Sequence, residues 1–143
     1  METTTYEVQG RVAGPGVSRA TCRDATISFD TSGGQGGSLF GPAELLAAAL
    51  AACLLKNVER FAGLLPFQYR DARVRVVAER RQTPPRMVRL RYELHLVTNE
   101  PRQRAELLHR NIRKFGTITN TLARACDLSG ELTTEAIPAD LSG

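Results

Sequence analysis

The chain has 143 residues, of which 42% are hydrophobic and 24% are charged, and this composition is ordinary for one globular domain. Nineteen lysine and arginine residues against fifteen acidic residues give a net charge of +4, which does not by itself indicate nucleic-acid binding. We therefore expect a single domain over residues 1–143, large enough to bury a core of its own.

The N-terminus and the cysteines indicate the cellular compartment. The segment from Met1 to Thr5 has neither the basic nor the apolar region of a signal peptide. Three scattered cysteines without a CxxC pair are too few for a disulfide framework and do not match a zinc site. We expect a cytoplasmic protein with reduced thiols, and we expect neither a metal nor a cofactor.

Three strands are predicted before residue 31. The segment from Tyr6 to Ala13 alternates apolar and polar side chains, and the segments Val17 to Cys22 and Ala25 to Phe29 follow after short turns. The glycine-rich segment from Thr31 to Ser38 lacks the lysine of a phosphate-binding loop. It is therefore interpreted as a plain flexible loop.

A long helix is predicted from Pro42 to about Ala62. Pro42 suits the first helical position, and Glu44 places a negative charge in the positive first turn. The eleven residues after Glu44 are all apolar, so this helix should be buried on every side, yet they are too few for a bilayer, which needs about 20. A lone thiol, Cys53, lies within this segment.

An antiparallel hairpin is predicted over residues 72–79 and 88–96. In both segments apolar residues alternate with charged ones, so one face should be buried and the other solvated. No exposed aromatic residues interleave with the basic ones, which favours a solvated sheet face over a nucleic-acid surface. The basic residues of this hairpin are Arg73, Arg75, Arg80, Arg81, Arg86, Arg89 and Arg91.

Two helices and a last strand should follow the hairpin. The first helix runs from Pro101 to Phe115, and Thr117 is expected to cap the second. The apolar face of the second helix consists of Ile118, Leu122 and Cys126. With a strand from Leu128 to Thr134, the order of elements predicts an α+β fold, with helices on one side of mostly antiparallel sheet.

Cys53 has two competing interpretations. A thiol in a packed helix is usually an inert small hydrophobe. Lys56 and Asn57, however, lie three and four residues later on the same helix face, where a cation would favour the thiolate. Residues that we expect to take no part in chemistry are Cys22 and Cys126, placed like core or strand-end residues, and His95 and His109, placed on solvated surface.

The Gly-rich loop after Asp30, followed by the run Pro42-x-Glu44-Leu45-Leu46-Ala47-Ala48-Ala49-Leu50-Ala51-Ala52-Cys53, resembles the OsmC/Ohr family of bacterial thiol-dependent hydroperoxide reductases. The order of elements along essentially the whole chain matches too. The resemblance implies a long central helix wrapped by antiparallel sheets, in an intertwined homodimer with active sites at the dimer interface. The sequence also favours an obligate dimer, because it has too few amphipathic elements to cover such a helix alone.

The family chemistry uses four groups, and the resemblance places each of them on this chain. The reactive cysteine falls on Cys53, and the arginine that favours its thiolate belongs near Arg19. The glutamate that orients this arginine falls on Ala43, and the resolving cysteine falls on Gly116, so both of these groups are missing. Cys126 lies ten residues beyond Gly116 and does not replace the lost cysteine by position.

Two functions lead, and a nucleic-acid-interacting protein that uses the basic hairpin is a third, weaker option. The first is thiol-dependent reduction of organic hydroperoxides, with Cys53 as nucleophile, Arg19 or Lys56 as activating cation, and an external thiol as reductant. The second is a non-catalytic module that binds a small hydrophobic ligand at the dimer interface. We expect neither nucleic acid nor a membrane as partner.

Overall fold

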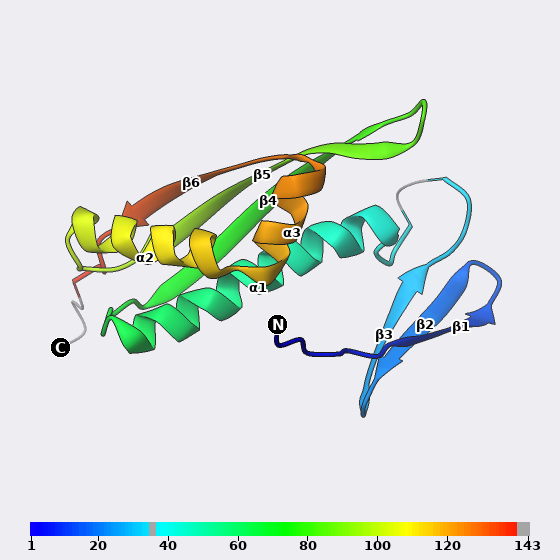
Figure 1. Cartoon of the computed structure of the whole chain (residues 1–143), viewed down its shortest axis with the longest axis horizontal. Coiled ribbons are helices and arrows are strands. Elements are labelled where there is room, and N and C mark those ends of the chain that lie inside the picture. Colours follow the sequence, from blue (N-terminus) through cyan, green and yellow to red (C-terminus); the bar gives the residue numbers. More distant parts are fainter. Residues whose placement is uncertain (35–36, 140–143) are drawn as a thin grey trace. The chain divides into compact units, whose positions relative to one another are not determined.

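The computed structural model describes residues 1–34 and 37–139, which form two compact units, Met1–Leu45 and Leu46–Gly143 (Figure 1). The predicted loop from Thr31 to Ser38 has neither helix nor strand in its described part, and Gln35 and Gly36 lie outside the described residues. No helix of the described chain is long and apolar enough to cross a membrane.

The N-terminal unit contains a three-stranded antiparallel sheet in the order β1-β2-β3, formed by Gln9–Gly14, Val17–Cys22 and Ala25–Asp30. The second and third strands lie where the alternation predicts them. The first begins later than expected, at Gln9 instead of Tyr6, because its partner ends: Gln9 pairs with Thr21, one residue before the end of β2.

The two faces of this sheet differ in character because successive side chains alternate between them. Val12 and Ile27 lie on one face and are 74% and 50% exposed. Arg19 lies on the other face, between Arg11 of β1 and Ser28 of β3 in the register. The apolar face of this thin sheet is therefore open to solvent in the single chain.

The predicted long helix is α1, Pro42–Leu64. The backbone N–H of Gly41 donates to Glu44 Oε1 at 2.9 Å, so Glu44 stabilises the helix start by a hydrogen bond as well as by its charge. Its buried apolar residues recur at helical spacing, which marks one face: Leu50, Leu54, Val58, Phe61 and Ala62. Burial in the single chain is thus one-sided rather than complete, and Leu55 on another face is 37% exposed.

The C-terminal unit contains a second sheet in the order β4-β5-β6, formed by Asp71–Arg81, Arg86–Val97 and Asp127–Glu135. β4 and β5 form the predicted antiparallel hairpin, whereas β6 runs parallel to β5. The sheet is therefore mixed. Parallel neighbours need a long crossover, and α2 (Arg102–Phe115) and α3 (Thr117–Ala125) supply it.

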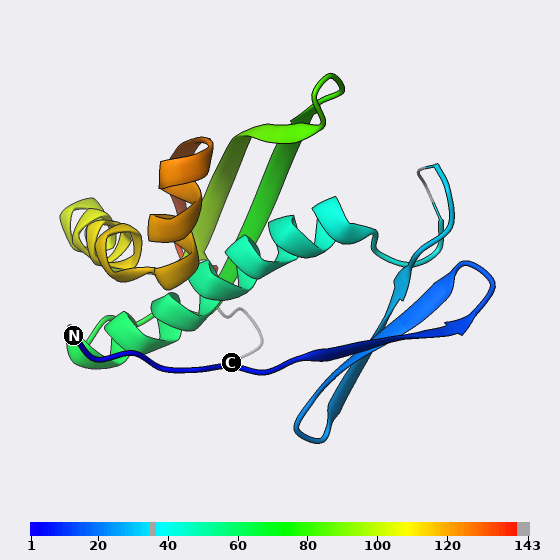
Figure 2. The same ribbon diagram turned by 45° about the vertical axis from the view of Figure 1, so that its right-hand side comes forward.

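The three helices α1, α2 and α3 lie on one face of this second sheet (Figure 2). The core forms between them and the sheet because the inward positions of β5 are apolar, from Leu90 to Leu96. The other face carries the predicted charged residues, many of them in exposed ion pairs such as Arg91 with Glu79 at 3.2 Å. Pairs of this kind contribute little to stability.

The start and end of α3 differ from the expectation. Thr117 is its first helical residue and not its cap, since Gly116 occupies the N-cap position and makes no side-chain capping hydrogen bond. Cys126 lies just beyond the helix end, where its backbone N–H still donates to the carbonyl of Leu122. Its side chain packs against the core together with those of Ile118 and Leu128.

The prediction of solvated histidines is wrong for His109. Its position on α2 continues the buried stripe of Ala105, Leu108 and Ile112, and its Nε2 lies 2.6 Å from the hydroxyl of buried Tyr92 in a hydrogen bond. Burial lowers the pKa of His109, and the nearby charges of two arginines lower it further. Burial also raises the pKa of Tyr92. His95 is half-buried as well and contacts Thr133 and Glu135 through its two ring nitrogens.

A substitution at Gly130 tests how tightly the C-terminal unit is packed. It lies beside Tyr92 in the parallel register, and a Cβ at position 130 would overlap the Tyr92 ring. We expect Gly130→Ala to lower the free energy of unfolding by about 3 kcal/mol, because the ring is held between sheet and helix and cannot yield. Urea denaturation measures this. Gly10→Ala in β1 is the matched control, since the nearest atom lies 4.0 Å away, and equal effects would contradict the packing described here.

Candidate functional site

Cys53 lies on α1 at the margin of its buried face and is half-buried. One helical turn later, Asn57 directs its side-chain amide back toward it. Asn57 Nδ2 donates to the carbonyl oxygen of Cys53 at 3.0 Å and contacts Cys53 Sγ at 3.7 Å. Within residues 1–34 and 37–139 this amide makes the only hydrogen bond to the Cys53 sulfur. The sequence spacing correctly indicated that Asn57 shares a face with the thiol.

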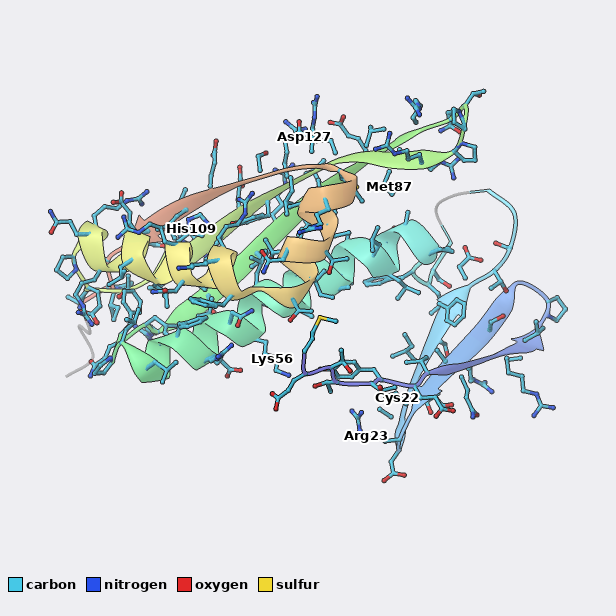
Figure 3. All side chains as sticks on the ribbon, viewed as in Figure 1. Cys22, Arg23, Lys56, Met87, His109 and Asp127 are labelled. Atoms are coloured by element: carbon cyan, nitrogen blue, oxygen red, sulfur yellow. The ribbon has the colours of Figure 1, made fainter. Side chains whose placement is uncertain are left out.

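Lys56, the other residue indicated by spacing, is exposed on α1 and projects away from the sheet (Figure 3). Lys56 also lines an open depression of about 510 Å³ between α1 and the start of β4. Ala52, Leu55 and Tyr69 are among the other residues of its wall. Cys53 itself does not line this depression.

Arg19, the predicted activating residue, lies in the middle of β2 in the N-terminal unit. Its side chain is exposed and shares the polar face of that sheet with Arg11. Cys53 belongs to the C-terminal unit. The role of Arg19 therefore stays a prediction.

The structure shows what surrounds positions 43 and 116, where the resemblance implies a glutamate and a resolving cysteine. At Ala43 the side chain is a methyl group, and the neighbouring Glu44 is already engaged with the Gly41 N–H. At Gly116 a Cβ would meet Thr119 Oγ1 at 2.7 Å and the carbonyl oxygen of Ile112 at 3.0 Å. The Thr119 side chain thus fills the space that a side chain at position 116 would need.

Thr119 was not indicated by the sequence, although helical spacing from Gly116 places it one turn into α3. It is 1% exposed, and in the described part of the chain its Oγ1 is the buried side-chain oxygen or nitrogen that lacks a hydrogen-bond partner. An unpaired buried hydroxyl costs about 1–3 kcal/mol. The start of α3 is therefore packed closely at a cost in stability.

The other two cysteines are free thiols with partners of their own. At the turn between β2 and β3, Arg23 Nη1 donates to Cys22 Sγ at 3.2 Å (Figure 3). Cys126 Sγ donates to the carbonyl oxygen of Met87 at 3.5 Å. In the described ranges, no three His, Cys, Asp or Glu side chains are grouped so that they could hold a metal ion.

The chain is an α+β protein with a cysteine on its long helix. Comparison with known proteins identifies the family to which it belongs. The family model described as OsmC-like protein matches residues 34–130, which is more than half of the chain and includes α1 and Cys53. The chain belongs to the OsmC-like family. No curated protein matches it.

Solved structures share the fold at low sequence identity. An OsmC-like protein from Mycoplasma pneumoniae is 16% identical, with a TM-score of 0.85 over 94% of this chain and 99% of that chain. An organic hydroperoxide resistance protein OsmC from Legionella pneumophila is 20% identical, with a TM-score of 0.69 over 92% and 99%. The organic hydroperoxide resistance protein OhrB of Bacillus subtilis is 19% identical, with a TM-score of 0.66 over 91% and 98%.

The close packing at Gly116 can be tested by placing a cysteine there, the residue that the resemblance implies for this position. We expect Gly116→Cys to lower the free energy of unfolding by about 1–3 kcal/mol, because the new side chain overlaps Thr119. The double variant Gly116→Cys/Thr119→Ala should recover part of this loss, since the Oγ1 atom is removed. Thermal or urea denaturation of both variants decides the matter, and a single variant as stable as the native chain would show that position 116 has room.

Proposed function

We propose that this protein reduces organic hydroperoxides in the cytoplasm, with Cys53 as nucleophile and an external small thiol as reductant. The observation that supports this most is the half-buried thiol on α1 with a side-chain amide at its sulfur, in a chain of the OsmC-like family. Two of the solved structures described above are named for organic hydroperoxide resistance.

The proposed reaction balances with a thiol as the only added reductant. The Cys53 thiolate attacks one oxygen of the hydroperoxide, the O–O bond breaks, and the alkoxide takes a proton to leave as an alcohol. Cys53 is thereby oxidised to a sulfenic acid. A first external thiol condenses with it to a mixed disulfide and releases water. A second thiolate then attacks the external sulfur, which restores the Cys53 thiolate and forms the oxidised thiol.

The external thiol is part of the proposal because the chain offers no evident internal one. Thr119 occupies the space at position 116, where the family has its resolving cysteine. The Cys126 thiol donates to a backbone carbonyl and packs against the core. A sulfenic acid at Cys53 should therefore persist until a small thiol reaches it.

A homodimer is also part of the proposal. The apolar face of the first sheet, with Val12 and Ile27, is exposed in the single chain, and so is Leu55 on α1. Exposed apolar surface of this kind is typical of an interface. A second copy of the chain would cover it and would complete the burial that the apolar sequence of α1 favours.

The nature of the oxidised product tests the proposed chemistry. We expect one equivalent of cumene hydroperoxide to convert Cys53 to a sulfenic acid that dimedone traps, and we expect no intramolecular disulfide. Peptide mapping by mass spectrometry identifies the modified residue, and Cys53→Ser serves as the blank. A bridge between Cys53 and Cys126 would contradict the requirement for an external thiol, and an unmodified Cys53 would contradict the enzyme.

The rate at which cumene hydroperoxide oxidises Cys53 identifies the activating cation. If Arg19 favours the thiolate, Arg19→Gln should slow oxidation of Cys53 by about tenfold or more, which is the effect of losing one close opposite charge. Lys56→Gln should then have little effect. Arg11→Gln is the matched control for Arg19→Gln, because Arg11 is exposed on the same sheet face.

The dimer predicts concentration-dependent stability. Because unfolding of an obligate dimer releases two chains, the unfolding midpoint should rise with protein concentration. Urea denaturation over a hundredfold range of concentration measures this, and light scattering gives the mass. A monomeric mass at micromolar concentration, with an unfolding midpoint that does not change, would contradict the dimer.

A second candidate function is binding of a small apolar molecule without turnover. The open depression beside α1, with Leu55, Val58 and Tyr69 in its wall, favours this function. It becomes the better interpretation if hydroperoxide leaves Cys53 unmodified while an apolar dye binds at a fixed molar ratio to the protein.

A further inference from the structure

Asn57 is an unusual residue at its position in α1. It is 8% exposed and lies among the buried apolar residues of the helix, near Leu54 and Phe61 in the same stripe. Asparagine is a poor helix former, and a buried amide is costly unless it finds hydrogen-bond partners. An apolar residue would fit this stripe better, so the amide calls for a specific explanation.

Both hydrogen bonds of the Asn57 amide end on the same residue. Nδ2 donates to the carbonyl oxygen of Cys53 at 3.0 Å and to its sulfur at 3.7 Å. An NH2 group has two N–H bonds, so it can donate to both atoms at once. The shorter bond to the backbone fixes the amide, and the fixed amide presents its second N–H to the thiol.

We propose that Asn57 is a positioning residue that holds the Cys53 sulfur and stabilises its thiolate by donating a hydrogen bond from its side-chain amide. This proposal rests on the proposed function for its role in catalysis, although the effect on the thiolate does not require turnover. A donor favours the charged form of its acceptor, and hydrogen bonds to ionised groups are about twice as strong as neutral ones. Burial keeps water from competing for the same N–H.

A purely structural role is the alternative. Asparagine in a helix can donate to the carbonyl four residues earlier, and Asn111 does so on α2, where Nδ2 donates to the carbonyl oxygen of Leu107 at 3.1 Å. The residue that accepts this bond is a leucine, so Asn111 has no thiol beside its amide. Asn111 therefore provides the matched control: the same kind of backbone bond without a thiol.

The first experiment compares the reactivity of Cys53 in variants that keep Cys53 as the single cysteine, through Cys22→Ser and Cys126→Ser. We expect Asn57→Leu to slow alkylation of Cys53 by iodoacetamide at pH 7 by about tenfold and to move the pH dependence toward higher pH, because the thiolate loses its donor. Asn57→Asp keeps the size and replaces the donor with an acceptor, and it should act in the same direction. Asn111→Leu should leave the alkylation rate unchanged.

The second experiment keeps the native Asn57 side chain and is independent of how well the Asn57 variants fold. In the same single-cysteine background, the side-chain NH2 resonances of ¹⁵N-labelled Asn57 should shift as Cys53 is titrated, and the midpoint should match that of the alkylation rate. Resonances that stay constant through the Cys53 titration would overturn the proposal. An alkylation rate in Asn57→Leu equal to that in Asn111→Leu would also overturn it.

These readouts separate the two proposals. If Asn57 controls the thiolate but hydroperoxide leaves Cys53 unmodified, the positioning role holds and the proposed function fails. If hydroperoxide oxidises Cys53 equally fast in the native chain and in Asn57→Leu, the enzyme holds and the role of Asn57 in it is excluded.

Discussion

The packing of one stripe of α1 against the core of the C-terminal unit is the constraint on which the rest depends. Leu50, Leu54 and Val58 are fully or almost fully buried, and they fix the rotation of the helix about its axis. That rotation leaves Cys53 at the margin of the buried face and turns Asn57 inward. The environment of the thiol is therefore a consequence of core packing, and the polar amide in the stripe is hydrogen-bonded to the carbonyl oxygen of Cys53.

Much of the fold could be predicted because its signals are local. Pro42 and Glu44 mark the start of α1, and alternating residues mark both strands of the β4–β5 hairpin. The features that the sequence did not predict depend on residues far apart in the chain. Alternation does not encode strand direction, so the sequence did not predict that β6 pairs parallel to β5. The burial of His109 depends on Tyr92, which lies on another element.

The candidate site was predictable only in part for the same reason. Helical spacing brought Asn57 to Cys53, since both lie on one helix. The close packing at Gly116 depends on how Thr119 orients its side chain, which no motif encodes. Together these two features describe a thiol with a fixed donor and without a second cysteine at the family's position. A one-cysteine reductase that uses an external thiol fits both.

The rate at which hydroperoxide oxidises Cys53 tests this interpretation most directly. Stopped-flow measurement with cumene hydroperoxide, in a chain where Cys22 and Cys126 are replaced by serine, gives the second-order rate constant for this one thiol. An activated cysteine should react at least about a hundredfold faster than free cysteine at the same pH, as expected when positioned groups stabilise both the thiolate and the leaving oxygen. A rate constant equal to that of free cysteine, or below it, would show that Cys53 is a packing residue and that the enzyme proposed here does not exist.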